Sequence, residues 1–325
     1  MNRREREILD YVAMDQRGST PAIVVTCYDF FDRLFPECGI DDFTEGIYCG
    51  DPSLPYEEAQ RNQHDWLLDR AECVAGTVLL DIGCGSGSLL EHARERGCGA
   101  VGINVSPRQV VRCRKRGLDV RLLDYRSIGQ EWNDQFDAII ANGSVEHFVQ
   151  PRDVLEDRAD TIYEEMFRLC RRLLDPASMS RRLVTTIIHF DRFVPDPREL
   201  LRSPFNFDWG SDLFHAALLE KTMGGYYPVE GQLERCAQPF FDLISQEDGT
   251  EDYRRTSEEW LARVRRNLLS FSRGWGIWRD LLPFVVRHPS QSLLSLLLLS
   301  SESWQWQFRG KRPPTKLLRQ TWRAR

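Results

Sequence analysis

Residues that could bind a cofactor lie at the end of a short apolar run. The run Val78–Ile82 contains Asp81 and breaks at Gly83, and Gly85 and Gly87 follow at alternate positions. Glycines let the backbone turn sharply and approach a ligand closely. A helix is predicted directly after them, and the free N–H groups of its N-terminus would point at the same place. The segment therefore predicts a buried strand, a tight turn and a cofactor at the carboxyl end of that strand.

The position of the carboxylate indicates the kind of cofactor. A dinucleotide fingerprint has its third glycine where this chain has Ser88. Asp81, two places before the first glycine, would repel a pyrophosphate and would suit the ammonium group of an amino acid. The turn resembles motif I of the class I S-adenosylmethionine (SAM) methyltransferases. The alternative is a strand–helix turn that binds nothing.

Strand and helix signals alternate after this turn. Further strands are predicted over 100–105, 119–123, 136–141 and 182–188, and helices are predicted after the cap Ser106-Pro107 and over 153–174. Such alternation predicts an α/β fold with a mostly parallel sheet and right-handed crossovers. Ligands of such sheets lie beyond the carboxyl ends of the strands.

Polar residues follow these strands and are predicted to line one crevice. Asn104 occupies the position of the usual ribose-binding carboxylate, and its amide can still donate and accept hydrogen bonds. Asp124 is predicted to accept a hydrogen bond from an adenine amino group, with Tyr125 flat against the ring. The alternative is that Asp124 only ends a strand. Asn142 and Glu146 follow the fourth strand.

The chain is predicted to form one domain over residues 1–325. Its parts are an N-terminal helical cover (1–75), a SAM-binding core (76–190), substrate-facing helical insertions (191–300) and a last strand with a basic tail (301–325). Within them, a sixth strand is predicted over 238–244 and helices over 28–35, from Pro55 to about Glu72, and over 256–269. The loop 42–52 is rich in functional side chains, although a plain linker is the alternative.

Composition excludes some classes of function. The net charge of −6 argues against broad binding to nucleic acid. The nine cysteines form no Cys-x-x-Cys pair, so neither a zinc site nor a disulfide framework is indicated, and no other metal site is predicted. No signal peptide is recognised at the N-terminus, and a reducing cytoplasm is the expected location.

Short segments in a fixed order carry a more specific resemblance. They are 28–31, 56–60, 80–85, 105–109, 124–126, 146–147, 224–228, 252–256 and 304–308. Their order and spacing together resemble the cyclopropane-fatty-acid synthase and mycolic-acid methyltransferase family, over most of the chain. The segment 304–308 resembles the last strand of that family.

The resemblance implies a fold, an activity and a set of site residues. The fold is the class I methyltransferase (Rossmann-like) doubly wound sheet, mostly parallel with a final antiparallel strand, with N-terminal helices and a helical lid. The activity is SAM-dependent C-methylation of an alkene carbon in a lipid or lipid-like acceptor. Expected cofactor residues are Thr44, Asp81, Gly83, Gly85, Gly87, Asn104, Gln109, Asp124, Tyr125 and Asn142; expected catalytic residues are Glu146, His147 and Tyr253; expected substrate contacts are Tyr28, Gly46 and Tyr226.

Methylation of an alkene makes particular demands on a site. The alkene is a weak nucleophile, and attack on a sulfonium methyl leaves a carbocation. The site must orient the alkene, exclude water and provide negative potential, to which aromatic faces can contribute. In the family, a carboxylate matching Glu146 and a tyrosine matching Tyr253 help to hold a bicarbonate ion that removes the proton.

Two departures from the family pattern concern this bicarbonate site. Gly46 stands where the family has a cysteine, with Cys49 three residues later, and Thr185 stands where it has a histidine, with His189 four residues later. If the original contact is made by a backbone amide, Gly46 could still serve. The sequence therefore predicts a C-methyltransferase with an altered bicarbonate site, whose product carries a ring, a methyl branch or a methylene group.

Two other functions remain open. One is a methyltransferase of the same fold that acts on a diffusible terpenoid or other natural product, and the other is a non-catalytic SAM-binding interaction module. The apolar run 292–299 is too short to span a bilayer. The basic tail 309–325, with Trp322, is interpreted either as a peripheral contact with an anionic membrane or as a solvated terminus.

Overall fold

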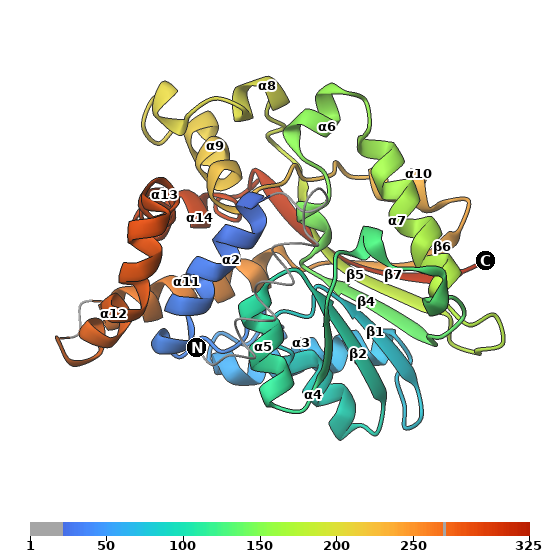
Figure 1. Cartoon of the computed structure of the whole chain (residues 1–325). Coiled ribbons are helices and arrows are strands. Elements are labelled where there is room, and N and C mark those ends of the chain that lie inside the picture. Colours follow the sequence, from blue (N-terminus) through green and yellow to red (C-terminus); the bar gives the residue numbers. More distant parts are fainter. Residues whose placement is uncertain (1–21, 269–270) are drawn as a thin grey trace.

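A seven-stranded sheet forms the centre of the computed structural model, which describes residues 22–268 and 271–325 (Figure 1). Its strands lie in the order β3-β2-β1-β4-β5-β7-β6, and only β7 runs antiparallel to its neighbours. The strands are β1 Val78–Ile82, β2 Gly99–Asn104, β3 Asp119–Leu122, β4 Ala138–Asn142, β5 Arg182–Phe190, β6 Phe241–Asp248 and β7 Thr315–Ala324. The predicted fold class, mostly parallel with a final antiparallel strand, is confirmed.

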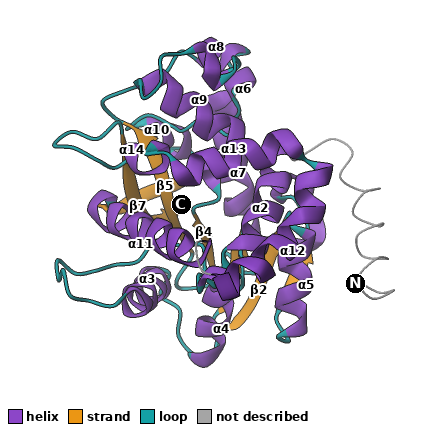
Figure 2. Cartoon of the chain, turned by 90° about the vertical axis from the view of Figure 1, so that its left-hand side faces the viewer, coloured by secondary structure: helices purple, strands orange, loops and turns teal. Residues whose placement is uncertain are grey.

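Helices cover the sheet and extend beyond it (Figure 2). The α-helices are α2 Ala22–Leu34, α3 Tyr56–Arg70, α4 Ser88–Glu95, α5 Pro107–Lys115, α6 Pro151–Leu155, α7 Ala159–Leu173, α8 Pro197–Leu200, α9 Asp212–Met223, α10 Gln232–Ala237, α11 Thr250–Leu268, α12 Phe271–Arg287, α13 Pro289–Ser300 and α14 Ser303–Trp306. Short 3-10 turns include Tyr125–Ser127 and Val145–His147, which directly follow β3 and β4 in the chain.

The order of the first strands places the site. β1 pairs with β2 on one side and with β4 on the other, so the direction of winding reverses beside β1. In open α/β sheets, the crevice at such a reversal is where ligands bind. The predicted strands for β1 to β5 agree with the observed ones to within about two residues. The Ser106 side chain caps α5 as predicted, accepting a hydrogen bond from the Gln109 amide.

Each sheet face is covered by its own helices, which explains the continuous apolar strands. On one face, α7 buries Met166 and Phe167 in the same core as Ile139 and Leu183. On the other face, α3 and α4 pack Leu67 and Leu89 against β1, β4 and β5.

A separate aromatic core joins the N-terminal helix to the late helices. Phe30 and Phe31 of α2 pack with Phe214 of α9, Trp260 of α11 and Trp304. Figure 1 shows α2, α11, α12 and α13 gathered on the side of the molecule away from β6, to the left of the sheet. The helices expected as a cover and as a lid therefore share one core.

The prediction of one continuous helix over 153–174 is wrong. Two helices, α6 and α7, occupy this stretch, and Asp157 between them has a φ of +52°. A left-handed residue cannot continue a right-handed helix. Asp153 stabilises the break, because it accepts from the Gln150 amide at the start of α6 and pairs with Arg158.

The predicted secondary structure of residues 301–325 is also wrong. Residues 303–306 form the helix α14, and the last strand is β7, built from the segment predicted as a basic tail. Trp322 is 1% exposed and Arg319 3% exposed, which places both in the sheet rather than at a membrane surface or in a solvated terminus. The sixth strand begins at Phe241, three residues later than predicted, because α10 and a turn occupy 232–240.

Candidate active site

A cavity opens beyond the carboxyl ends of β1, β2 and β4. Most of the predicted cofactor residues line it: Thr44, Asp81, Gly83, Gly85, Asn104, Gln109, Asp124, Tyr125 and Asn142. Tyr28 and His147 line it as well. We call this space the cofactor cavity.

The glycine turn forms one wall of the cofactor cavity. Gly83 has a φ of +84°, and a Cβ at this position would lie 2.6 Å from the Cβ of Ser144. Its amide donates to the Ile103 carbonyl at 2.9 Å, which ties the turn to β2. A Cβ on Gly85, whose φ is +50°, would meet no atom within 4 Å, so the backbone here borders open space. Backbone atoms can therefore approach a ligand closely at this turn.

Gly87 serves packing at the start of α4. It has a φ of +83°, and a Cβ there would meet Leu118 at 2.6 Å and the Cys113 sulfur at 2.9 Å. Gly87 lies outside the described lining of the cofactor cavity. Its predicted contact with a cofactor therefore has no support from the cavity.

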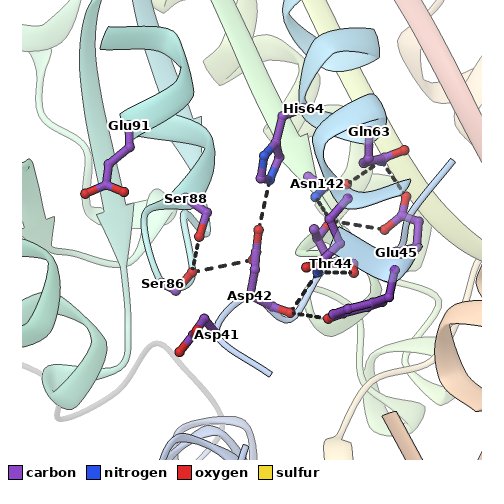
Figure 3. A network of polar contacts seen from close by, with 12 residues as sticks. Asp41, Asp42, Thr44, Glu45, Gln63, His64, Ser86, Ser88, Glu91 and Asn142 are labelled. Atoms are coloured by element: carbon purple, nitrogen blue, oxygen red, sulfur yellow. Dashed lines mark hydrogen bonds and ion pairs between the residues drawn. The ribbon is translucent and has the colours of Figure 1, made fainter. Parts of the chain in front are cut away.

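Asp81 is a buried carboxyl group facing the cofactor cavity, with an exposed fraction of 3%. Burial raises its pKa to about 7, and the charge of Asp42 adds to the rise while His64 opposes it. Figure 3 shows Asp42 between two partners: its carboxylate lies 2.8 Å from His64 Nε2 and accepts a hydrogen bond from Ser86 at 3.5 Å. A cationic group beside Asp81 would offset the cost of its burial.

Local hydrogen bonds fix the orientation of the polar residues after β2. The Asn104 side-chain amide donates to Gln109 Oε1 at 2.7 Å and to the Gly85 carbonyl at 3.2 Å, and its oxygen accepts from the Ser106 amide. Gln109 in turn donates to Asp32 at 2.8 Å. The two predicted cofactor residues Asn104 and Gln109 thus form a single unit at the cavity wall.

The predicted adenine residues lie together but already interact with neighbours. The Asp124 carboxylate accepts from the backbone amide of Arg126 at 2.9 Å and pairs with its guanidinium at 2.9 Å. Tyr125 stacks on Phe148, with ring centroids 3.9 Å apart and an interplanar angle of 15°. Phe148 lines the same cavity and was missed at the level of sequence.

A second, smaller cavity adjoins the first, and we call it the acceptor cavity. Both linings include Tyr28, Phe43, Thr44, Asn142, Gly143 and His147. The acceptor cavity adds two of the predicted catalytic residues, Glu146 and Tyr253, together with Glu45, Tyr227, Trp304 and Gln307. Apolar side chains, among them Leu219, Met223 and Leu317, complete the wall.

Glu146 is the carboxyl group at the junction of β4, β5 and this cavity. Its Oε1 accepts a hydrogen bond from the Ile188 amide at 3.0 Å, and its buried Oε2 has no partner among the described residues. Burial raises the pKa of Glu146 to about 8, and the charge of Glu45 adds to the rise. A buried polar atom without a partner in a cavity wall is a candidate contact for a ligand.

Tyr28 and His147 belong to the linings of both cavities. The Tyr28 hydroxyl forms a 2.9 Å hydrogen bond with His147 Nε2, and His147 Nδ1 lies 3.1 Å from the Gly224 carbonyl. Burial lowers the pKa of His147, so its imidazole is held neutral at physiological pH.

Two predicted substrate contacts lie elsewhere. The Gly46 amide donates to Thr256 Oγ1 at 2.9 Å and its carbonyl accepts from Arg319, so the expected free amide is already bonded. Tyr226 packs in the sheet core and donates to the Pro195 carbonyl at 2.8 Å. Its neighbour Tyr227 faces the acceptor cavity instead, with its hydroxyl donating to Gln307 at 2.9 Å.

The residues at and near the family histidine position also lie away from the acceptor cavity. Thr185 is fully buried and accepts a hydrogen bond from Trp322 Nε1 at 3.0 Å. His189 is buried outside the described linings of both cavities, with its Nδ1 2.9 Å from the Ile187 carbonyl.

Several functional residues were missed at the level of sequence. Asp42, Phe43 and Glu45 belong to the loop that was singled out without assigning individual roles. His64 of α3 carried no signal, since a lone histidine on an amphipathic helix is common. Trp304 was assigned to a strand, and its place in the acceptor cavity follows from its helix α14.

The described residues lack a metal-binding cluster and a membrane-spanning helix. They contain no group of three or more His, Cys, Asp or Glu side chains that could hold a metal ion. None of the helices in ranges 22–268 and 271–325 has the length and apolar character to cross a membrane.

Comparisons with known proteins agree with this fold. Over 94% of the chain, the structure matches the mycolic acid cyclopropane synthase CmaA1 complexed with SAH and CTAB, with a TM-score of 0.68, 17% identity and 99% of that chain covered. It also matches the 4+2 cyclase SpnF over 94% of this chain and 97% of that chain, with a TM-score of 0.63 and 19% identity. The fold is therefore that of the class I SAM-dependent methyltransferases.

Sequence comparison identifies the family within this class. The family model for mycolic acid cyclopropane synthetase matches residues 22–272, so the chain belongs to that family of SAM-dependent methyltransferases. Cyclopropane mycolic acid synthase 2 of Mycobacterium leprae (strain TN) is 33% identical over 156 residues, which are 46% of this chain and 47% of that protein. The chain thus aligns with about half the length of this curated relative.

Proposed function

We propose that this protein transfers the methyl group of SAM to an alkene carbon of a lipid or lipid-like acceptor. The observation that carries the proposal is the pair of adjoining cavities. The cofactor cavity has a glycine turn and the buried carboxyl group of Asp81. The acceptor cavity is lined by aromatic side chains and by Glu146, whose Oε2 has no hydrogen-bond partner among the described residues. The family membership and the CmaA1 complex with SAH and CTAB, a cationic lipid-like molecule, support the same assignment.

The residues of the cofactor cavity fit SAM. Asp81 offers a buried carboxylate to the ammonium group, and the cation would compensate for the burial that raises the pKa of Asp81. The glycine turn gives backbone access beside it. Asn104 with Gln109 suits ribose hydroxyls, and the Asp124–Tyr125 segment suits adenine. Thr44 and Asn142, hydrogen-bonded to each other, lie where the two cavities meet.

Bound SAM would supply an electrophilic methyl group. The residues of this chain would then orient the acceptor and stabilise the positive charge that develops on it. Tyr28, Phe43, Tyr227, Tyr253 and Trp304 present aromatic side chains to the acceptor cavity, and aromatic faces attract cations. The Glu146 carboxyl adds negative potential, because a nearby positive charge favours its ionised form. The apolar wall excludes water.

We propose in addition that the bicarbonate site of the family is altered in this chain. The Gly46 amide, which would have to contact the ion, already donates to Thr256, and Thr185 is fully buried outside the described linings of both cavities. His189 lies outside the described linings of both cavities. A diffusible, oxygen-bearing acceptor is a second candidate, favoured by the buried Trp304 Nε1, which has no partner among the described residues.

Methyl-labelled SAM tests the proposal directly. The protein is incubated with vesicles of unsaturated phospholipids and, separately, with small unsaturated alcohols. Label in the acyl chains supports the lipid acceptor, and label only in the small molecules favours the second candidate. Calorimetry that detects no SAM binding would refute both. Glu146→Gln should reduce turnover far more than SAM affinity, while the exposed Glu58→Gln should change neither.

A further inference from the structure

Glu45 is a second carboxyl group in the wall of the acceptor cavity. It is 4% exposed, and it belongs to the loop between α2 and α3. Its Oε1 accepts from the Gln63 side chain at 2.7 Å, and its Oε2 accepts from Thr44 Oγ1 at 3.4 Å. Figure 3 shows this contact within a network that also includes Asn142 and anchors the loop to the end of β4. Glu45 is therefore held in place rather than free to turn to solvent.

The two carboxyl groups have different charged and polar neighbours. Glu45 adds to the rise in the pKa of Glu146, so the two groups repel each other when both are ionised. Burial also raises the pKa of Glu45, but the Arg319 guanidinium and hydrogen bonds oppose that rise. Two carboxyl groups in unequal environments divide the roles of acid and base. Glu45 is the member of the pair favoured to carry the charge.

Two backbone donors near this pair are already bonded within the protein. The Gly46 amide donates to Thr256, and the Ile188 amide donates to Glu146 itself. Among the buried side-chain atoms of the cavity wall that the structure describes, one acceptor, Glu146 Oε2, and one donor, Trp304 Nε1, have no partner. Two carboxyl groups in the wall of one cavity favour a cation over an anion.

We propose that Glu45 takes the proton released by the methylated acceptor, so that the reaction needs no external base such as bicarbonate. This inference rests on the proposed function. In the step, the C–H bond that breaks belongs to the transferred methyl group or to the carbon next to the cationic carbon, and its proton passes to the Glu45 carboxylate. The electron pair of that bond forms the new carbon–carbon bond of a ring or the π bond of an alkene, and the positive charge is neutralised.

Two probe ions test the charge preference of the cavity without any turnover. The octyltrimethylammonium ion, below its micelle concentration, should bind the wild-type protein, and Glu45→Gln should weaken this binding about tenfold, as the loss of one nearby charge predicts. Glu45→Asp should keep most of the affinity, and Glu58→Gln should leave it unchanged. Bicarbonate should not compete. Equal cation affinity in the wild type and Glu45→Gln, or competition by bicarbonate, would overturn the inference.

Turnover with labelled SAM supplies the second test. In CO₂-free buffer the wild type should keep its full rate, and Glu45→Gln should lose on the order of 10²-fold or more, the usual contribution of a general base. Its SAM affinity should stay the same, since Glu45 lies outside the described lining of the cofactor cavity. A wild-type rate that depends on added bicarbonate would refute the role of Glu45. A wild type that methylates no acceptor would refute the proposed function, and the cation measurement would still test the charge preference.

Discussion

Glu146→Gln should stabilise the protein at neutral and alkaline pH. Burial raises the pKa of Glu146 from 4.5 to about 8, so between these values the folded protein holds a proton that the unfolded chain has released. The free energy of unfolding therefore falls as pH rises through this interval. At pH 7 the cost is on the order of 3 kcal/mol, from about 2.5 pH units at about 1.4 kcal/mol each.

A glutamine should remove this cost and little else. Its side-chain oxygen can still accept from the Ile188 amide, and its NH₂ group replaces a carboxyl OH that is equally without a partner among the described residues. At pH 7 the folded wild type and the folded Glu146→Gln variant are therefore alike. Their free energies of unfolding differ because only the glutamate ionises in the unfolded chain.

Denaturant unfolding at pH 5 and pH 8 measures this effect. The gap between Glu146→Gln and the wild type should be below about 1 kcal/mol at pH 5 and should grow by a few kcal/mol by pH 8. Glu58→Gln, on the exposed face of α3, should follow the wild type at both pH values. Parallel pH profiles for Glu146→Gln and the wild type would show that Glu146 is ionised in the folded protein, and the reasoning would fail.

Three further substitutions test other parts of the site. Asp81→Asn should weaken SAM binding by about 10- to 100-fold in calorimetry. The SAM affinity of the wild type should rise as the pH passes about 7, where Asp81 ionises, and the affinity of Asp81→Asn should not. Gly83→Ala should lower both the unfolding midpoint and SAM affinity, because its φ is +84° and the new Cβ would lie 2.6 Å from Ser144; unchanged values would refute the assigned role of the turn. Trp322→Phe removes the hydrogen bond to Thr185 and should cost about 1 kcal/mol of stability while leaving SAM affinity unchanged.

The sequence alone determined the sheet around β1 and the turn after it. Strands β1, β2, β4 and β5 are largely apolar runs and β3 alternates polar and apolar residues, and Ser106 caps α5 through a bond within the same turn. These signals are local, so they can be recognised without knowing the rest of the fold. The position of Asp81 before the glycines already indicated an amino-acid cofactor.

Only the tertiary structure decided that the segment Thr315–Ala324 forms a strand inside the sheet. β7 contains two arginines, a lysine and three uncharged polar residues, a composition that suits an exposed tail. It lies instead between β5 and β6, where Thr185 accepts from Trp322 and Asp252 pairs with Arg319. Such partners are more than 60 residues away in the chain, and no local pattern predicts them.

The acceptor cavity was likewise beyond what local patterns determine. Gly224 and Gly225, with φ values of +72° and +111°, set the backbone so that Tyr226 enters the core and Tyr227 faces the cavity. Glu45 approaches Glu146 only because its loop is bonded to α3 and to β4. The sequence predicted which residue types would do the chemistry. Their directions depend on backbone turns and on long-range packing, so only the folded chain decides which of them meet.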